Sequence, residues 1–217
     1  MPCSSRDAVV NDIDAHLVSL VAPTSAAAED YRTLRAAVER LARDRPCQVV
    51  AVSSPGAQEG KTLTAINLAA TLAQVEKRRV LLLDVDLRTA ALAQYLGLAR
   101  QPGFVDIIHS QASLDSVVTW VRPNLGVVAA GTTTDAPYEV LSAPRLREAI
   151  DEARRSYDFV VLDTPPIVSV ADCRSIADFV DGFIVVVAAH RTQRAAIDAA
   201  LRRIDPAKLL GLVLNQA

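Results

Sequence analysis

Cysteine and histidine are scarce in this sequence and lie far apart. Three of each occur among 217 residues, and no Cys-x-x-Cys pair is present. The cysteines are Cys3, Cys47 and Cys173, and the histidines are His16, His109 and His190. Zinc sites and disulfide frameworks need such residues at close or paired spacing. The sequence therefore argues against both kinds of site and favours three reduced thiols.

Long apolar runs and an excess of positive charge are also absent. No apolar stretch approaches the roughly 18 residues that a membrane-spanning helix needs. The first ten residues, MPCSSRDAVV, lack the charged and then apolar layout of a signal peptide. The formal net charge is −2, without the basic excess typical of nucleic-acid-binding proteins. We therefore expect a cytoplasmic protein that binds no nucleic acid and reaches the inner face of the cell membrane only through a partner.

Short apolar runs alternate with helical stretches through most of the chain. The runs begin at residues 49, 80, 159, 183 and 212, with a weaker one at 125, and helices are expected at 61–76, 89–96, 138–154, 172–179 and 192–204. Strands that are buried on both faces of a parallel sheet have this continuous apolar pattern. Strands and helices in alternation predict an α/β fold, a doubly wound and mostly parallel sheet with helices on both faces. The length of 217 residues fits one such domain.

The N-terminal part has a different organisation. Apolar residues recur at helical spacing between Val9 and Val21, and the small-residue segment PTSAAA follows as a linker. A helix with one apolar face is expected from Glu29 to Arg43. These features place an N-terminal extension at residues 1–28 and a single domain at residues 29–217.

The segment SSPGAQEGKT follows the first apolar run and precedes a helix. A Gly-Lys-Thr sequence between a strand and a helix is the context that a phosphate-binding loop, or P-loop, requires. Backbone amides there form an anion-binding nest, and Gly56 and Gly60 let the chain curl close to the phosphates. Lys61 would reach the β- and γ-phosphates, and the Thr62 hydroxyl would ligate magnesium. Pro55 stands where the strict pattern has its first glycine, and a helix start with an exposed lysine is the alternative interpretation.

Carboxylates follow two further apolar runs. Asp84 and Asp86 end the run at residue 80, and Asp163 ends another. In a doubly wound sheet the carboxyl ends of the strands lie beside the P-loop. Magnesium prefers oxygen ligands, so Asp163 could hold it directly or through water, and Asp84 could hold it or accept a proton. Arg88 could steady a phosphate or pair with an acid. The alternative for each acid is a helix N-cap or a surface ion pair.

Three motifs, SPGAQEGKT, LLLDVDLR and VVLDTPP, resemble in order and spacing the Walker A, A′ and B motifs of bacterial tyrosine kinases. This is the CpsD/CapB family, which includes the cytoplasmic domain of Wzc. Upstream, EDYRTLR is similar to the family's Glu-x-x-Arg-x-x-Arg oligomerisation motif. Downstream, APYEVLSAPRLRE is similar to its Asn-Pro-x-Glu-Leu-Leu segment, and DGFIVVV and GLVLN match its last strands. The resemblance covers most of the chain and implies a P-loop NTPase fold of the MinD-like type.

The resemblance implies ATP-dependent phosphorylation of protein tyrosines, coupled to polymerisation and export of capsular or extracellular polysaccharide, with ATP and Mg²⁺ as cofactors. By it the catalytic residues are Lys61, Asp84, Asp86 and Asp163, and the metal ligands are Thr62, Asp84 and Asp163. The nucleotide-binding residues are Gly56, Gly60, Lys61, Thr62, Leu63, Arg88 and Asn215, the last standing where related P-loop ATPases contact the base. The oligomerisation residues are Glu29, Arg32 and Arg35, and they imply a ring-like homo-oligomer. They form one charged stripe on their helix, which we expect to face away from the domain. The alternative is a solvated face with an internal Glu29–Arg32 pair. A transmembrane, Wzz-like polysaccharide co-polymerase is the implied membrane partner and activator.

Two features depart from the family pattern. The family usually carries a tyrosine-rich tail as the site of autophosphorylation, whereas the four tyrosines here are dispersed. Some members have an internal tyrosine at the position of Ala91. The acceptor therefore stays open, and so do two other functions, a MinD- or ParA-like ATPase switch and an ATP-binding regulator without kinase activity. Against the switch, Gly56 stands where those ATPases carry an additional lysine.

Overall fold

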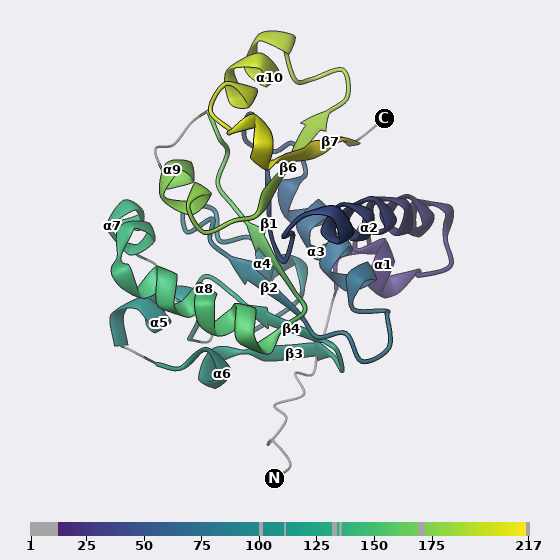
Figure 1. The fold of residues 1–217 in the computed structure, drawn as a ribbon. Coiled ribbons are helices and arrows are strands. Elements are labelled where there is room, and N and C mark those ends of the chain that lie inside the picture. Colours follow the sequence, from purple (N-terminus) through teal and green to yellow (C-terminus); the bar gives the residue numbers. More distant parts are fainter. Residues whose placement is uncertain are drawn as a thin grey trace.

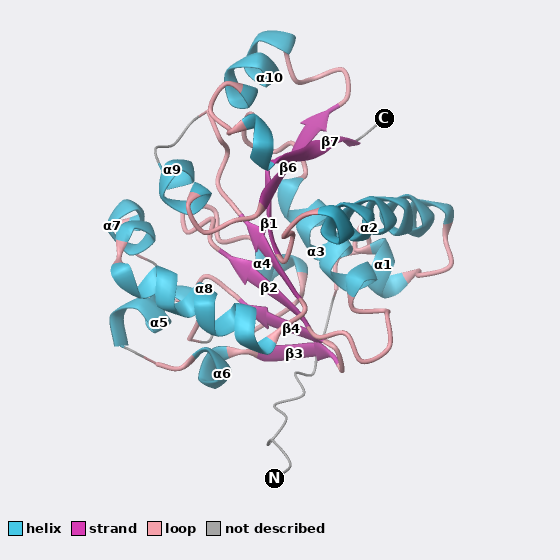
Figure 2. Cartoon of the chain, viewed as in Figure 1, coloured by secondary structure: helices cyan, strands magenta, loops and turns pink. Residues whose placement is uncertain are grey.

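Seven strands form one sheet in the computed structural model, in the order β3-β4-β2-β5-β1-β6-β7 (Figures 1 and 2). The structure describes residues 13–99, 102–110, 112–131, 134, 136–168 and 172–215. The strands are β1 (Val49–Ser53), β2 (Val80–Asp84), β3 (Thr119–Arg122), β4 (Leu125–Val128), β5 (Phe159–Asp163), β6 (Gly182–Ala188) and β7 (Leu209–Asn215). Strand β3 is antiparallel to β4, and the other neighbouring pairs are parallel. The prediction of a mostly parallel sheet is therefore confirmed.

Helices cover both faces of this sheet, as the alternating pattern predicted. They are α1 (Val18–Val21), α2 (Ala26–Asp44), α3 (Lys61–Leu72), α4 (Leu92–Tyr95), α5 (Phe104–Ser110), α6 (Leu114–Val117), α7 (Pro137–Ser142), α8 (Pro144–Ser156), α9 (Asp172–Ala177) and α10 (Arg194–Leu201), with a 3-10 turn at Pro206–Lys208. Figure 1 shows α1, α2 and α3 together on one side of the sheet, and α5, α7, α8 and α9 on the other. The fold is thus the doubly wound α/β class.

The two faces of the central strands feed two separate apolar cores. Val50 and Val52 of β1 pack in one core with Ile66 of α3. Val49 and Ala51 of the same strand belong to the other core, beneath α8. Successive strand residues point to opposite faces, so both must be apolar when both faces are covered. This explains why the runs show no polar alternation.

Residues that precede α2 pack against the domain. Leu17 is fully buried in the same core as Val38 of α2. The Asn67 side chain of α3 accepts from Ser19 N at 2.8 Å and donates to His16 O at 3.1 Å. The segment just before α2 is therefore held by both apolar and polar contacts, while the domain boundary after residue 28 stays a prediction.

Helix α2 begins at Ala26, three residues before the predicted start at Glu29. The cause is Ser25, whose hydroxyl accepts from Ala28 N at 3.2 Å and so caps the helix. Of the helix expected between Val9 and Val21, residues 9–12 lie outside the described part of the chain, and α1 accounts for only the last four residues.

The single helix predicted over residues 138–154 is wrong, because α7 and α8 are separate. Ala143 between them is extended, with ψ at 139°, and it precedes Pro144. A residue before proline is disfavoured in the helical region, so the first helix must end there. The other predicted helices and strands are present with shifted ends. The sequence did not indicate β3, α5 or α6, which are short and carry little apolar periodicity.

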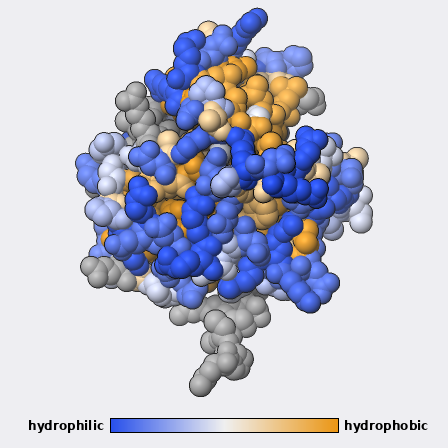
Figure 3. Space-filling model, viewed as in Figure 1, coloured by the Kyte–Doolittle hydropathy of each residue, from blue (hydrophilic) through white to orange (hydrophobic). Residues whose placement is uncertain are grey.

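The edge strand β7 leaves apolar side chains in contact with solvent. Leu212 is 52% exposed and Leu214 is 64% exposed. Figure 3 shows a hydrophobic area over this end of the molecule. None of the helices in the described part of the chain has the length and apolarity that crossing a bilayer requires. Cys47 is a buried free thiol, while Cys3 and the side chain of Cys173 lie outside the described residues.

Candidate active site

The P-loop connects β1 to α3 and is shaped by one glycine. Gly60 has φ +91°, a left-handed conformation that glycine adopts without strain, and it caps α3. A Cβ atom at this position would lie 1.9 Å from Asn215 Nδ2. Both the backbone angle and the close approach of Asn215 therefore require glycine. The turn directs the first amides of α3 toward the loop, as an anion site needs.

A cavity of about 240 Å³ lies against this loop. Its wall includes Lys61, Thr62 and Leu63 from the first turn of α3, and Tyr95 and Pro166 from the segments after β2 and β5. The carboxyl ends of three strands thus meet around one cavity. Leu63 and Tyr95 also border a neighbouring cavity of about 510 Å³, which Asn215 lines.

Lys61 is buried among carboxylates. Its Nζ lies 2.6 Å from Asp86 Oδ2 and 3.8 Å from Asp163 Oδ1, and it donates to Thr62 Oγ1 at 3.3 Å. Burial acts to lower the pKa of Lys61, but the charges of Asp163 and Asp86 outweigh it and raise that pKa. The lysine is therefore a fixed positive charge. The alternative of an exposed lysine at a helix start does not fit this burial.

Asp84 lies directly opposite Asp163 in the register of the neighbouring strands β2 and β5. Its Oδ1 accepts from Asp86 N at 3.2 Å, and its Oδ2 accepts from Leu92 N at 3.4 Å. Burial, together with the charges of Asp163 and Asp86, raises the pKa of Asp84 well above its ordinary value. A carboxyl group with a raised pKa is a stronger base than an exposed aspartate.

Asp163 is the buried acid with the fewest partners. Neither of its carboxylate oxygens accepts a hydrogen bond from any described residue. Burial raises the pKa of Asp163 to about 6, although the charge of Lys61 acts in the opposite direction. Buried polar atoms are almost always satisfied, so these two oxygens mark a place where a ligand, ion or water belongs.

The donors present fit magnesium only as part of a larger set of ligands. Asp84, Asp163 and the Thr62 hydroxyl offer hard oxygen atoms, which magnesium prefers. No group of three or more acidic, histidine or cysteine side chains in the described residues forms a metal cage by itself. Magnesium usually keeps waters and shares substrate phosphates rather than binding in an all-protein cage. The site therefore suits a magnesium–nucleotide pair better than a free ion.

The other residues that were predicted to bind the nucleotide differ in whether they line the phosphate cavity. Gly56 and Arg88 do not line the phosphate cavity, whereas Leu63 does. Asn215 donates from Nδ2 to Glu59 O at 3.1 Å, so its amide nitrogen holds the loop. Sequence reasoning missed Glu59, which is buried inside the loop. The sequence feature that could have indicated Glu59 is its position as the one charged side chain in the segment SSPGAQEG.

The predicted oligomerisation residues on α2 have partners inside the chain. Arg32 Nε donates to Glu29 Oε2 at 2.6 Å, which is the local pair expected as the alternative. Arg35 donates from NH1 to Thr71 O at 3.0 Å and lies 3.6 Å from Glu39. We expected the whole charged side to face away from the domain. Arg35 instead turns toward α3, because the carbonyl groups at the end of a helix attract cations.

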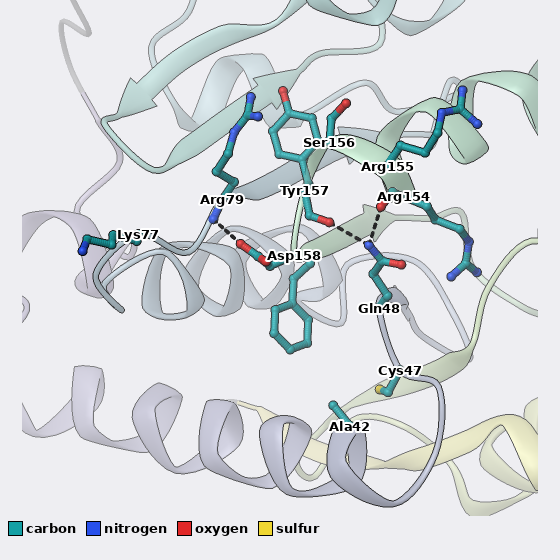
Figure 4. A pocket seen from close by; sticks show the side chains of 11 residues that line it. Ala42, Cys47, Gln48, Lys77, Arg79, Arg154, Arg155, Ser156, Tyr157 and Asp158 are labelled. Carbon is teal, nitrogen blue, oxygen red and sulfur yellow. Dashed lines mark hydrogen bonds between the residues drawn. The ribbon is translucent and has the colours of Figure 1, made fainter.

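A larger cavity lies at the opposite edge of the sheet, where the strands begin. It measures about 590 Å³, and Figure 4 shows Arg79, Arg154 and Gln48 around it. Gln48 Nε2 donates to the carbonyl oxygens of Arg154 and Tyr157 at 2.7 Å each, and Arg154 pairs with Asp181. The hydrogen-bonding groups of these residues are thus paired with one another, and they cover the amino ends of the strands. The smaller cavity instead is lined by Lys61 and Thr62, and Asp86 and Asp163 lie against Lys61 behind this wall, which is why we place the active site there.

Known proteins resemble this chain in sequence and in fold. A family model described as an AAA domain matches residues 47–208. The tyrosine-protein kinase YwqD of Bacillus subtilis (strain 168) is 32% identical over 203 residues, which cover 92% of this chain and 85% of YwqD. The chain belongs to the bacterial tyrosine kinase family. The crystal structure of the chimerical protein CapA2B2 has a TM-score of 0.87 at 24% identity, over 97% of this chain and 94% of that one, and it confirms the fold.

Members of this kinase family differ in length. The tyrosine-protein kinase ptk of Acinetobacter johnsonii is 31% identical over 192 residues, which cover 87% of this chain but only 26% of ptk. The chain thus spans about a quarter of that relative and most of YwqD.

We predict that Asp163→Asn stabilises the protein in EDTA at high pH. An acid whose pKa rises from 3.8 to about 6 on folding lowers stability as pH rises through that window, because the unfolded state loses its proton first. The advantage of the variant over wild type should grow by about 2 kcal/mol between pH 4 and pH 8. Urea unfolding at both pH values measures it.

Asp151→Asn is the control, because Asp151 is an exposed acid on α8. An unchanged difference between Asp163→Asn and wild type at the two pH values would contradict the prediction. We also predict that Asp163→Asn loses magnesium-dependent activity to a greater extent than magnesium-independent nucleotide binding, because the Asp163 carboxylate would serve the metal.

Proposed function

We propose that this protein is an ATP-dependent protein-tyrosine kinase that regulates polymerisation and export of capsular or extracellular polysaccharide. The observation that carries the proposal is the buried ammonium group of Lys61 at the start of α3, surrounded by carboxylates from β2 and β5. Membership of the bacterial tyrosine kinase family supports the same activity.

Nucleotide binding would use Lys61 and the loop amides. Lys61 pairs with Asp86 at 2.6 Å, and a γ-phosphate would compete with this carboxylate for the ammonium group. The amides at the start of α3 add positive potential, so the phosphate gains more than the carboxylate does. Thr62 and Asp163 would hold magnesium, with Asp84 as a further ligand where it does not act as the base, and the ion would offset phosphate charge when bound.

Transfer itself would form a bond between the phenolic oxygen and the γ-phosphorus, while the bond to the β-phosphate oxygen of ADP breaks. A tyrosine hydroxyl has a pKa near 10, so a carboxylate base beside it helps remove the proton. Asp84 is suited to this role because burial raises its pKa. Positioning and charge neutralisation supply the rest of the catalysis.

We predict that Lys61→Met abolishes ATP turnover and tyrosine phosphorylation. Methionine keeps the length of the side chain but removes the positive charge of the P-loop lysine, which would face the phosphates. Purified protein with Mg-ATP, probed for phosphotyrosine and for ADP release, measures both activities. Circular dichroism checks that the fold persists.

Lys77→Met is the matched control, since Lys77 is exposed and remote from the cavity. Undiminished turnover in Lys61→Met would disprove the site assignment. ATP turnover in wild type without any phosphotyrosine would instead favour the ATPase switch, and ATP binding without turnover would favour the regulator without kinase activity.

Three of the chain's four tyrosines are poor acceptors because they are buried or half-buried. Tyr157 is 3% exposed, and burial raises its pKa to about 12. Burial also raises the pKa of Tyr31, and Tyr95 is half-buried at the edge of the phosphate cavity. Tyr138 on α7 is the most accessible, at 50% exposed. A separate tyrosine-bearing protein is therefore the better substrate.

We predict that a tyrosine-rich peptide is phosphorylated at least about tenfold faster than the chain itself, because in-line attack needs an accessible hydroxyl. Radiolabel transfer to peptide and protein in one reaction measures the ratio. Rapid, stoichiometric modification of Tyr31, Tyr95 or Tyr157, found by mass spectrometry, would refute it.

Assembly is a further part of the proposal. Glu29, Arg32 and Arg35 would contact the nucleotide site of a neighbouring copy, where carboxylates could meet the arginines, in a head-to-tail ring. A transmembrane, Wzz-like co-polymerase would hold the ring at the inner face of the membrane and activate it.

We predict that Arg32→Ala combined with Arg35→Ala gives a monomer that still binds ATP. Because Arg35 also holds α3 through Thr71 O, the single variant Arg32→Ala separates assembly from stability. Arg40→Ala, on an exposed part of the same helix, is the control. Light scattering at high concentration measures the mass. If wild type and both arginine variants have the same mass, the charged stripe is only a solvated face.

A further inference from the structure

The P-loop contains a buried carboxylate that does not face the phosphates. Glu59 is 7% exposed, yet it stands between Gln58 and Gly60 in the middle of the binding loop. It is not among the residues that line the phosphate cavity. A buried carboxylate is costly unless hydrogen bonds satisfy it, so its partners show what it does.

Both oxygens of the Glu59 carboxylate are engaged. Oε2 accepts from Gly56 N at 2.9 Å, which closes the loop on itself. Oε1 accepts from the Thr192 hydroxyl at 2.7 Å, a contact across 133 residues of sequence. The main-chain oxygen of Glu59 accepts from Asn215 Nδ2 at 3.1 Å. The loop is therefore tied to the ends of both β6 and β7.

Thr192 is itself held in one orientation. Its Oγ1 accepts from Ala188 N at 3.0 Å, and its own N donates to Ala188 O at 3.0 Å. The hydroxyl proton is then directed at Glu59, because the oxygen already accepts from the end of β6. Ala189 N also donates to Asn215 O at 2.8 Å, which joins the β6 and β7 ends. Neither valine nor alanine at position 192 could make this chain of bonds.

These contacts have two effects on the anion site. They fix the spacing between Gly56 and Gly60, so the loop amides stand in place before a phosphate arrives, and less freedom is lost on binding. They also hold the negative charge of Glu59 on the side away from the cavity. Without the Thr192 hydroxyl, the Glu59 carboxylate would lose one of its two hydrogen bonds.

We infer that Glu59 and Thr192 are positioning residues for the nucleotide, through which the turn between β6 and α10 sets the shape of the P-loop. The inference rests on the proposed nucleotide site. It adds that the residue before Gly60 acts on affinity through the loop backbone and touches neither phosphate nor metal.

The test is the affinity for Mg-ADP, measured by titration calorimetry on the full chain. A hydrogen bond to a charged group contributes enough that its loss should raise Kd about tenfold in Thr192→Val and in Glu59→Gln. Thr192→Ser keeps the hydroxyl and should stay within about twofold of wild type. The double variant should be no weaker than Glu59→Gln alone, because Thr192 acts on the loop through Glu59. KM for ATP should rise with Kd, while kcat changes less.

Thr71→Val is the matched control, because it removes a buried hydroxyl from α3 whose partners among the described residues are Asn67 O and Leu68 O. It should not alter Kd. Wild-type affinity in Thr192→Val, or losses that multiply in the double variant, would overturn the inference. Equal weakening by Thr192→Ser and Thr192→Val would do so as well, since the hydroxyl would then not matter. Lys61→Met distinguishes a failure of this inference from a failure of the proposed nucleotide site. If Lys61→Met also keeps wild-type affinity for Mg-ADP, the nucleotide site itself is misplaced.

Discussion

The site depends on one buried positive charge shared by three acids. Lys61 Nζ lies 2.6 Å from Asp86 and 3.8 Å from Asp163, and Asp84 stands opposite Asp163 in the sheet register. Removing three carboxylates from water costs several kcal/mol each unless partners replace the lost solvation. One ammonium group cannot satisfy all three. Burial, together with the neighbouring carboxylate charges, raises the pKa of both Asp84 and Asp163, and neither oxygen of Asp163 accepts a hydrogen bond from a described residue.

This excess of acids over ammonium groups makes the site less stable than an apolar core would be, and suited to cationic or hydrogen-bonding ligands. Active sites commonly trade stability for such prepared electrostatics. Sheet order creates the arrangement, because β5 lies between β1 and β2. The acids of β2 and β5 therefore end beside the lysine that follows β1. Replacing Lys61 or one of the three acids changes the electrostatic environment of the groups that remain. Single substitutions here should therefore affect both the stability of the protein and the way that this stability depends on pH.

Much of the fold followed from the sequence because both faces of the central strands are covered. Continuous apolar runs then predict β1, β2, β5 and β6, and Gly60-Lys61-Thr62 predicts the turn into α3. The break at Ala143 was missed, although Pro144 gave a physical reason for it. Strand β3 was missed because a four-residue edge strand ending in Arg122 has no comparable apolar run.

For the candidate site, the residue types indicated a phosphate loop with acids beside it, but only the register places Asp84 opposite Asp163. Side-chain direction was the other unknown. The helical spacing of Glu29, Arg32 and Arg35 gives one stripe, yet Arg35 turns to a carbonyl group of α3. Motif reasoning treats the residue before Gly60 as variable, and the role of Glu59 emerges only from contacts across 133 residues.

The place of β1 in the sheet explains why its loop is supported from two sides. On one side lie β5 and β2, whose acids set the charge around Lys61. On the other lie β6 and β7, whose ends reach Glu59 through Thr192 and Asn215. Charge balance and backbone shape thus come from different strands. The two can vary independently, since a change at the β6 end alters how well the amides fit a phosphate without altering which acids face the lysine.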